Sequence, residues 1–168
     1  MPHVLIVAYG NPLRSDDGVA WRAADALSRK FPKAEVEILC FHQLAPELAE
    51  TVSRFAAVIF IDAASPRQGA DKPGEVQIER IGQETIDHKD ATPFSHVLTP
   101  HTVVALATTL YGAKLRASLV TVTGENFEHG ESLSGAVAAA LPELISKIGT
   151  IVEAALSTDR LPPGSHRP

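Results

Sequence analysis

The sequence predicts an α/β fold: a single-domain, doubly wound, mostly parallel sheet of about five strands with helices on both faces. One observation is that residues 4–9 and 56–61 are continuous apolar runs, which is typical of central parallel strands covered on both faces. Another is that helical patterns separate these runs, so that strands alternate with helices along the chain. Right-handed crossovers between the parallel strands then place helices on both sides of the sheet.

Three further segments are predicted to be strands. Residues 117–123 (ASLVTVT) continue the series of parallel strands. Residues 35–41 alternate between polar and apolar side chains at first, which predicts a position nearer an edge. Residues 74–81 also alternate and follow a turn-rich stretch, so we expect an antiparallel or edge strand there.

The helices are predicted from apolar residues at helical spacing and from their end signals. Residues 19–27 carry apolar side chains at i, i+4, i+7 and i+8. Thr99 followed by Pro100 is typical of an N-cap and the first helical position. The final helical segment starts near Ser132, and we expect Pro142 to break or kink it.

The bulk composition predicts one ordinary globular domain over residues 1–156. Residues 157–168 are polar and rich in proline and are predicted to form a disordered tail. The net charge of −5 gives no basic surface for nucleic acid or for anionic membranes. No apolar run approaches the roughly 20 residues that a membrane span needs.

The single cysteine, Cys40, cannot form an internal disulfide, and we expect it to be a small buried hydrophobe. The chain starts on a predicted strand rather than on a basic leader with an apolar segment. Both observations favour a cytoplasmic location.

Two carboxylates and an imidazole are predicted to meet at one edge of the sheet. Asp17 follows the first strand, Asp62 ends the strand of residues 56–61, and His101 lies in the first turn after Pro100. The carboxyl ends of parallel strands share an edge, where open α/β proteins hold their ligands. An O, O, N set with open positions suits a divalent metal such as zinc, nickel or iron. The same three groups could equally perform general acid–base chemistry without a metal.

Each of the three residues also has a simpler interpretation. A carboxylate in a first helical turn is favourable there, so Asp16 can be a plain N-cap and Asp17 can serve the helix dipole. An Asp at a strand end often caps the next segment, and a His at a helix start is more often a local hydrogen-bonding group than a ligand. The loop of residues 124–131 follows another strand at the same edge, and it either lines the cleft or is a surface loop.

The sequence resembles the hydrogenase maturation proteases, the endopeptidases that finish the large subunit of nickel–iron hydrogenases. The segments that carry the resemblance are GNPLRSDDGV (10–19), IDA (61–63), TPH (99–101), VTGE (122–125) and LS (133–134). Two positions differ from the usual family pattern. Ala20 stands where a second glycine is usual, and Tyr9 stands where a small residue precedes the Gly-Asn pair.

The resemblance implies a doubly wound fold of roughly five strands and a site that recognises a metal. It implies that Asp17, Asp62 and His101 contact nickel, with Asp17 and Asp62 as the catalytic residues. The nickel is contributed by the substrate, a hydrogenase large-subunit precursor, and the protease itself holds no permanent metal. The reaction removes a short C-terminal extension of that precursor.

Two alternatives remain open at this point, and the sequence does not give the oligomeric state. One is a stand-alone metallohydrolase of small peptides or amides that carries its own zinc. The other is a non-enzymatic nickel-binding chaperone or sensor that cuts nothing.

Overall fold

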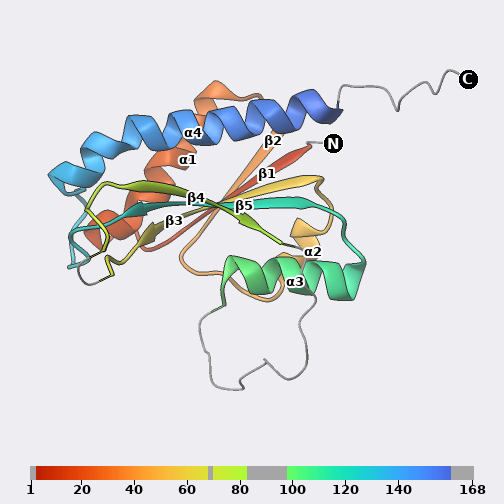
Figure 1. Ribbon diagram of the computed structural model, residues 1–168, viewed down its shortest axis with the longest axis horizontal. Coiled ribbons are helices and arrows are strands. Elements are labelled where there is room, and N and C mark those ends of the chain that lie inside the picture. Colours follow the sequence, from red (N-terminus) through yellow and green to blue (C-terminus); the bar gives the residue numbers. More distant parts are fainter. Residues whose placement is uncertain (1–2, 68–69, 83–97, 160–168) are drawn as a thin grey trace, which may run out of the picture.

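The computed structural model describes residues 3–67, 70–82 and 98–159 (Figure 1). These residues form a five-stranded sheet of order β2-β1-β3-β5-β4, in which only β4 is antiparallel to its neighbour. The strands are β1 (Val4–Tyr9), β2 (Val36–Phe41), β3 (Ala57–Ala64), β4 (Val76–Ile81) and β5 (Arg116–Thr123). The predicted fold class is confirmed, as are the edge position of β2 and the antiparallel edge strand β4.

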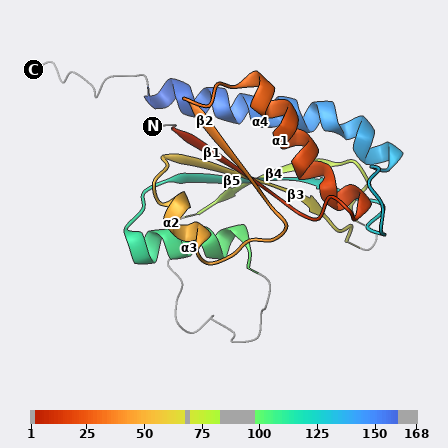
Figure 2. The same ribbon diagram turned by 180° about the vertical axis from the view of Figure 1, so that it is seen from behind.

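Helices cover both faces of the sheet, as expected. Figures 1 and 2 show α1 and α4 on one face and α2 and α3 on the other. A short 3₁₀ turn, η1, leads into α1. The helical elements are η1 (Ser15–Gly18), α1 (Val19–Lys30), α2 (Leu48–Val52), α3 (Pro100–Tyr111) and α4 (Gly135–Asp159).

Strand β1 explains why the sequence needs this layered arrangement. Val4 and Ile6 pack into the core under α1 and α4, whereas Leu5 and Val7 pack into the core under α2 and α3. All four side chains are completely buried. Successive side chains of a strand point to opposite faces, so a continuous apolar run requires cover on both sides.

The chain order creates a crevice between β1 and β3. From β1 the chain crosses through α1 to β2 on one side, and it then returns through α2 to β3 on the other side of β1. The loops that follow β1 and β3 therefore diverge at the carboxyl edge of the sheet. Such a topological switch point is the usual place for a ligand in an open α/β sheet.

The start of α3 is as predicted. Thr99 is the N-cap, and its side chain accepts a hydrogen bond from the backbone N–H of Thr102 at 3.2 Å. Pro100 occupies the first helical position, where its missing N–H costs nothing because that group has no partner within the helix.

Helix α4 differs from its prediction in three ways. It is continuous through Pro142, because proline removes one backbone hydrogen bond while the buried residues on either side hold the helix on the sheet. It extends to Asp159, so residues 157–159 are helical rather than part of a tail; residues 160–168 lie outside the described part. By length and composition alone, its segment Gly135–Thr158 is long and apolar enough to cross a membrane, whereas no apolar segment of that length was expected from the sequence.

Cys40 is exposed, and its expected burial is wrong. The reason is its position near the end of β2, which lies at the edge of the sheet and, among the described strands, pairs with β1 alone.

Candidate active site

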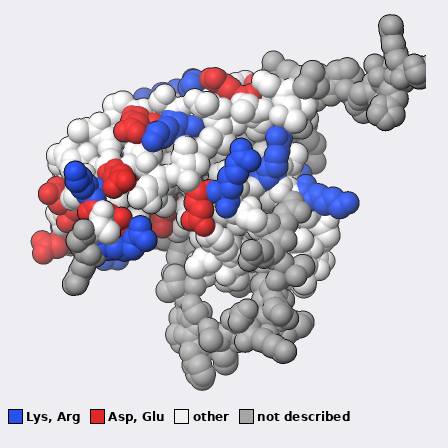
Figure 3. Space-filling model, viewed as in Figure 1, with Lys and Arg blue, Asp and Glu red and all other residues white. Residues whose placement is uncertain are grey.

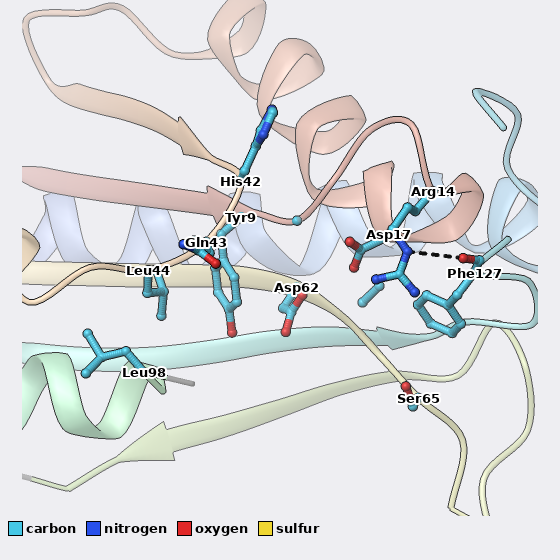
Figure 4. Close-up of a pocket in the computed structure, with 12 residues that line it drawn as sticks. Tyr9, Arg14, Asp17, His42, Gln43, Leu44, Asp62, Ser65, Leu98 and Phe127 are labelled. Atoms are coloured by element: carbon cyan, nitrogen blue, oxygen red, sulfur yellow. Dashed lines mark hydrogen bonds between the residues drawn. The ribbon is translucent and has the colours of Figure 1, made fainter. Parts of the chain in front are cut away.

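A cavity of about 390 Å³ opens at the switch point between β1 and β3 (Figure 4). Its wall comes from the ends of these strands, from the loop before η1, from the segment after β2 and from the loop after β5. The lining residues are Tyr9, Gly10, Arg14, Asp17, His42, Gln43, Leu44, Asp62, Ala63, Ser65, Leu98 and Phe127. Asp17 and Asp62, predicted from separate strand ends, therefore share one cavity.

Asp17 is held by the turn that precedes it. The backbone N–H of Asn11 donates a hydrogen bond to its Oδ2 at 2.7 Å, which leaves Oδ1 without a protein donor among the described residues. Gly10 makes this turn possible because its φ is +142° and because an added Cβ would lie 2.2 Å from the carbonyl oxygen of Asp17. The Gly-Asn pair of the sequence thus fixes the first carboxylate at the cavity wall.

Asp62 is the most strongly perturbed carboxyl group of the cavity. Its pKa is raised from the ordinary 3.8 to about 7, mainly by burial and also by the negative charge of Asp17. Hydrogen bonding by the Tyr9 hydroxyl and by the backbone N–H of Ala63 acts in the opposite direction. Near neutral pH the group is therefore divided between its acid and its carboxylate form.

Tyr9 lies at the end of β1, and its ring points into the cavity so that the hydroxyl faces the Asp62 carboxyl group (Figure 4). Burial, and then the charge of Asp62, raise the pKa of Tyr9 far above its ordinary value of 10.0. The phenol therefore remains protonated and serves as a hydrogen-bond donor. This residue is the one that departs from the small side chain usual before the Gly-Asn pair.

Two substitutions are expected to move the pKa of Asp62 in opposite directions. Tyr9→Phe removes a donor to the carboxylate and should raise this pKa above 7, whereas Asp17→Asn removes a neighbouring negative charge and should lower it. The measurement is a pH titration of the Asp62 carboxyl carbon by ¹³C NMR. Ser65→Ala, which alters another lining residue, should leave the titration unchanged; equal shifts in all three variants would refute this description of the cavity.

His101 does not join the two carboxylates in this structure. Its Nε2 atom lies 2.7 Å from Oε1 of Glu79 on β4, and both side chains are about half exposed. Strand β5 separates β4 from β3, so this pair lies two strand spacings, or roughly 10 Å, to the side of Asp62. The part of the chain that the structure describes contains no group of three His, Cys, Asp or Glu side chains arranged to hold a metal.

Asp16 is not the N-cap of a helix, contrary to the simple interpretation of the sequence. It is completely buried and fastens the loop of residues 124–134, which connects β5 to α4. Its Oδ2 accepts from the backbone N–H groups of Glu125 at 2.8 Å and Asn126 at 2.9 Å. Ser134 donates through its N–H to Oδ1 at 2.7 Å and through its hydroxyl to Oδ2 at 2.8 Å.

These bonds determine the ionisation of Asp16. Burial alone would raise its pKa, but the three backbone N–H groups and the Ser134 hydroxyl outweigh burial and hold the pKa below its ordinary value. The 124–134 loop is thereby fastened against η1, and it contributes Phe127 to the cavity wall. The expectation that residues 124–131 line the cleft is confirmed for this residue.

Sequence reasoning missed Arg14 and His42 as lining residues, and it did not single out Phe127 within the 124–131 loop. His42 directly follows β2, so the rule that located Asp17 and Asp62 at strand ends also applies to it. Its ring lies 5.5 Å from that of Trp21, whose Nε1 donates to the carbonyl of Gly10 at 3.0 Å. No comparable signal marks Phe127, because its position depends on the buried contacts of Asp16.

Comparisons with known proteins identify the fold. A scan against protein-family models gives no match, and a search of curated proteins gives none either. Among solved structures, the hydrogenase maturating endopeptidase HybD from E. coli is similar, with 23% identity and a TM-score of 0.69 over 92% of this chain and 94% of that chain. The hydrogenase maturation protease HycI from Thermococcus kodakarensis is also similar, with 19% identity and a TM-score of 0.67 over 90% and 92% of the two chains.

A third similar structure is the hydrogenase maturation protease HybD from Thermococcus kodakarensis, with 22% identity and a TM-score of 0.63. The match covers 90% of this chain and 99% of that one. In each case the similarity extends over nearly the whole length of both chains. This chain therefore has the fold of the hydrogenase maturation endopeptidases.

Proposed function

We propose that this protein is an endopeptidase that removes a short C-terminal extension from a nickel-loaded hydrogenase large-subunit precursor. The observation that carries the proposal is the shared cavity of Asp17 and Asp62 at the switch point of this fold. The three solved structures described above are named as hydrogenase maturation endopeptidases or proteases. The sequence segments that resemble this family include both aspartates.

The pair of carboxylates suits recognition of a divalent cation that arrives with the substrate. Two neighbouring negative charges oppose each other, which is part of the reason for the high pKa of Asp62. A divalent ion relieves this repulsion and displaces the proton of Asp62, so nickel in the precursor strengthens binding. Thiolates of the substrate can complete the coordination, because two carboxylates leave several positions around the ion open.

The chemical step that we assign to this pair is hydrolysis of a peptide bond. One carboxylate accepts a proton from the attacking water, and geometry permits either Asp17 or Asp62 to do so because both line the cavity. The nickel of the substrate, held by the pair, identifies a loaded precursor and orients its C-terminal segment. The enzyme itself then needs no metal of its own.

His101 is proposed as a third contact to the nickel. For this role it must leave Glu79, and an exposed pair of this kind holds it by only about 0–1 kcal/mol. Binding of the precursor would therefore have to draw the imidazole from β4 toward β3. The contact with Glu79 is the resting position of this side chain.

His101→Ala is expected to weaken binding of the nickel-loaded precursor while leaving folding nearly intact, because the side chain is exposed. The measurement is the affinity of the variant for loaded and for nickel-free precursor by calorimetry. His129→Ala, at another exposed histidine outside the cavity lining, is the matched control. An unchanged preference for the loaded form in His101→Ala would remove this residue from the site.

A cytoplasmic location and the lack of nucleic-acid and membrane partners belong to the proposal as well. They are supported by the acidic net charge of −5 and by the absence of any cysteine besides Cys40.

The proposal is tested by the intact mass of a hydrogenase large-subunit precursor after incubation with this protein. We expect loss of a C-terminal fragment when the precursor carries nickel. Precursor of unchanged mass, bound to the protein in a nickel-dependent manner, would point to a chaperone. Cleavage of small peptides by a zinc form of the protein, without any precursor, would point to a stand-alone hydrolase.

A further inference from the structure

We propose that Arg14 forms an oxyanion subsite: its guanidinium group binds the negatively charged oxygen that develops on the scissile carbonyl. This inference rests on the proposed peptidase function and assigns a residue that the sequence did not single out. It is carried by the position of Arg14 at the cavity, by its unpaired nitrogens and by the charges around it.

The guanidinium group is held at the cavity by one of its nitrogens and remains available through the other two. Nε of Arg14 donates to the carbonyl oxygen of Phe127 at 3.3 Å (Figure 4). Within the described part of the chain, Arg14 makes no ion pair and no other side-chain hydrogen bond. Both terminal nitrogens can therefore donate to a substrate oxygen, and the planar group keeps them in a fixed relation to each other.

The backbone around Arg14 is fixed more firmly than its exposed side chain suggests. The N–H of Gly130 donates to the carbonyl of Leu13 at 2.8 Å, and the N–H of Ser15 donates to the carbonyl of Gly130 at 2.7 Å. The Ser15 hydroxyl also donates to the carbonyl of Glu128 at 2.9 Å. These bonds fix the backbone that carries the Arg14 guanidinium group. A hydrogen-bond donor that is already in place stabilises a developing charge without reorganisation during the reaction.

Charges at the cavity favour an anion only when the substrate's metal is present. Asp17 and Asp62 carry two negative charges when both are ionised, and Arg14 supplies one positive charge. A divalent ion cancels the two carboxylates and leaves the positive charge of Arg14 in excess. Without that ion the cavity is negative and opposes an oxyanion. Stabilisation of the oxyanion by Arg14 therefore requires the nickel of the substrate. Loading with nickel is thus a condition for catalysis as well as for binding.

The step assigned to Arg14 is the formation and collapse of the tetrahedral intermediate. Water oxygen forms a bond to the carbonyl carbon, and the π electron pair moves to the carbonyl oxygen, which Arg14 binds. The proton released by water goes to a carboxylate of the pair. When the C=O bond re-forms, the C–N bond breaks, and the nitrogen takes that proton and leaves as an amine.

Arg22 provides a matched control for this role. It is exposed, and like Arg14 it donates a guanidinium hydrogen bond to a carbonyl of the 124–134 loop, that of Glu131 at 3.0 Å. It does not line the cavity. Arg14→Gln and Arg22→Gln therefore remove the same charge and one loop contact each, but only the first removes a donor from the cavity.

The experiment measures kcat and KM for cleavage of nickel-loaded precursor by the wild type and both variants. We expect Arg14→Gln to lower kcat by about 10²–10³-fold with KM changed by less than about threefold, because the lost interaction exists only in the transition state. Arg14→Lys should recover part of this loss, and Arg22→Gln should keep kcat within about twofold of the wild type. Equal effects of Arg14→Gln and Arg22→Gln, or a raised KM with unchanged kcat, would overturn the proposal.

A second measurement separates this inference from the proposed function. Acetate serves as an oxygen-anion probe, and the ¹⁵N–¹H signal of Arg14 Nε is recorded by NMR in the wild type and in the double variant Asp17→Asn/Asp62→Asn, which removes the two negative charges that the metal would cancel. Acetate at millimolar concentration should shift this signal in the double variant and much less in the metal-free wild type. A shift in the double variant, together with a wild type that cleaves no precursor, would retain the subsite and reject the peptidase function; the absence of any shift in the double variant would reject the subsite.

Discussion

Asp62→Asn is expected to stabilise the folded protein at pH 8 while abolishing cleavage of the precursor. The carboxyl group of Asp62 is held in a buried cavity, where its ionisation is costly. Asparagine has nearly the same shape and can accept from the N–H of Ala63, but it carries no charge at any pH. The costly ionisation of Asp62 lowers the stability of the folded protein. Loss of stability at a catalytic group is common, because activity often requires it.

The pH dependence follows from the direction of the pKa change. The pKa of Asp62 is raised to about 7 in the folded state, above the ordinary value of 3.8. Between about pH 4 and pH 7 the folded state therefore binds the proton that the unfolded state has lost. The folded state loses stability as pH rises through this window, by at most about 4 kcal/mol. Asp62→Asn escapes that loss.

The measurement is the free energy of unfolding in urea at pH 4.5 and at pH 8. At pH 8 we expect Asp62→Asn to be more stable than the wild type by about 2–4 kcal/mol, and at pH 4.5 we expect a much smaller difference. Asp25→Asn, at an exposed carboxylate paired with Arg29, should change stability by less than about 1 kcal/mol at both pH values. A variant that is less stable than the wild type at pH 8 would contradict our description of Asp62.

Asp16→Asn is expected to have the opposite effect, a loss of stability of about 3–5 kcal/mol near neutral pH. The carboxylate receives four hydrogen bonds from Glu125, Asn126 and Ser134 in a site with no exposed surface. An amide offers one acceptor oxygen, and its NH₂ group would face N–H donors that it cannot satisfy. Because the pKa of Asp16 lies below its ordinary value, its contribution should be lost as pH falls through the acid range.

Urea unfolding of Asp16→Asn and of the exposed control Asp25→Asn at pH 7 measures this loss. NMR should also show changed amide signals for Glu125, Asn126 and Ser134 in Asp16→Asn, because their acceptor is replaced. A loss below about 1 kcal/mol, comparable to that of Asp25→Asn, would show that the 124–134 loop does not depend on Asp16.

The fold could be predicted from local patterns because burial on both faces leaves a direct mark on the sequence. The continuous apolar run of β1 requires helices on two sides, and the alternation in β4 indicates a strand at the edge of the sheet. Asp17 and Asp62 could be placed together for the same reason, since parallel strands bring their carboxyl ends to one edge.

Contacts between distant segments could not be predicted in this way. Asp16 binds a loop that lies more than 100 residues later in the chain, and nothing near it in the sequence indicates those partners. The first turn of α3 was located correctly, but the position of His101 depends on which strand the helix crosses. Cys40 is exposed because β2 is an edge strand. The order of the strands in the sheet determines this exposure, and the residues next to Cys40 in the sequence do not indicate it.

The central claim is that this site recognises the nickel of the substrate and that the protein cuts only a nickel-loaded precursor. The most direct test uses two forms of the precursor in one tube. Nickel-loaded precursor of natural isotopic composition and nickel-free precursor labelled with ¹⁵N are mixed with the protein, and intact masses are recorded over time. We predict that only the unlabelled, nickel-loaded form loses a C-terminal fragment, and that Asp62→Asn cleaves neither. Equal cleavage of both forms would contradict the claim that the reaction requires the metal of the substrate.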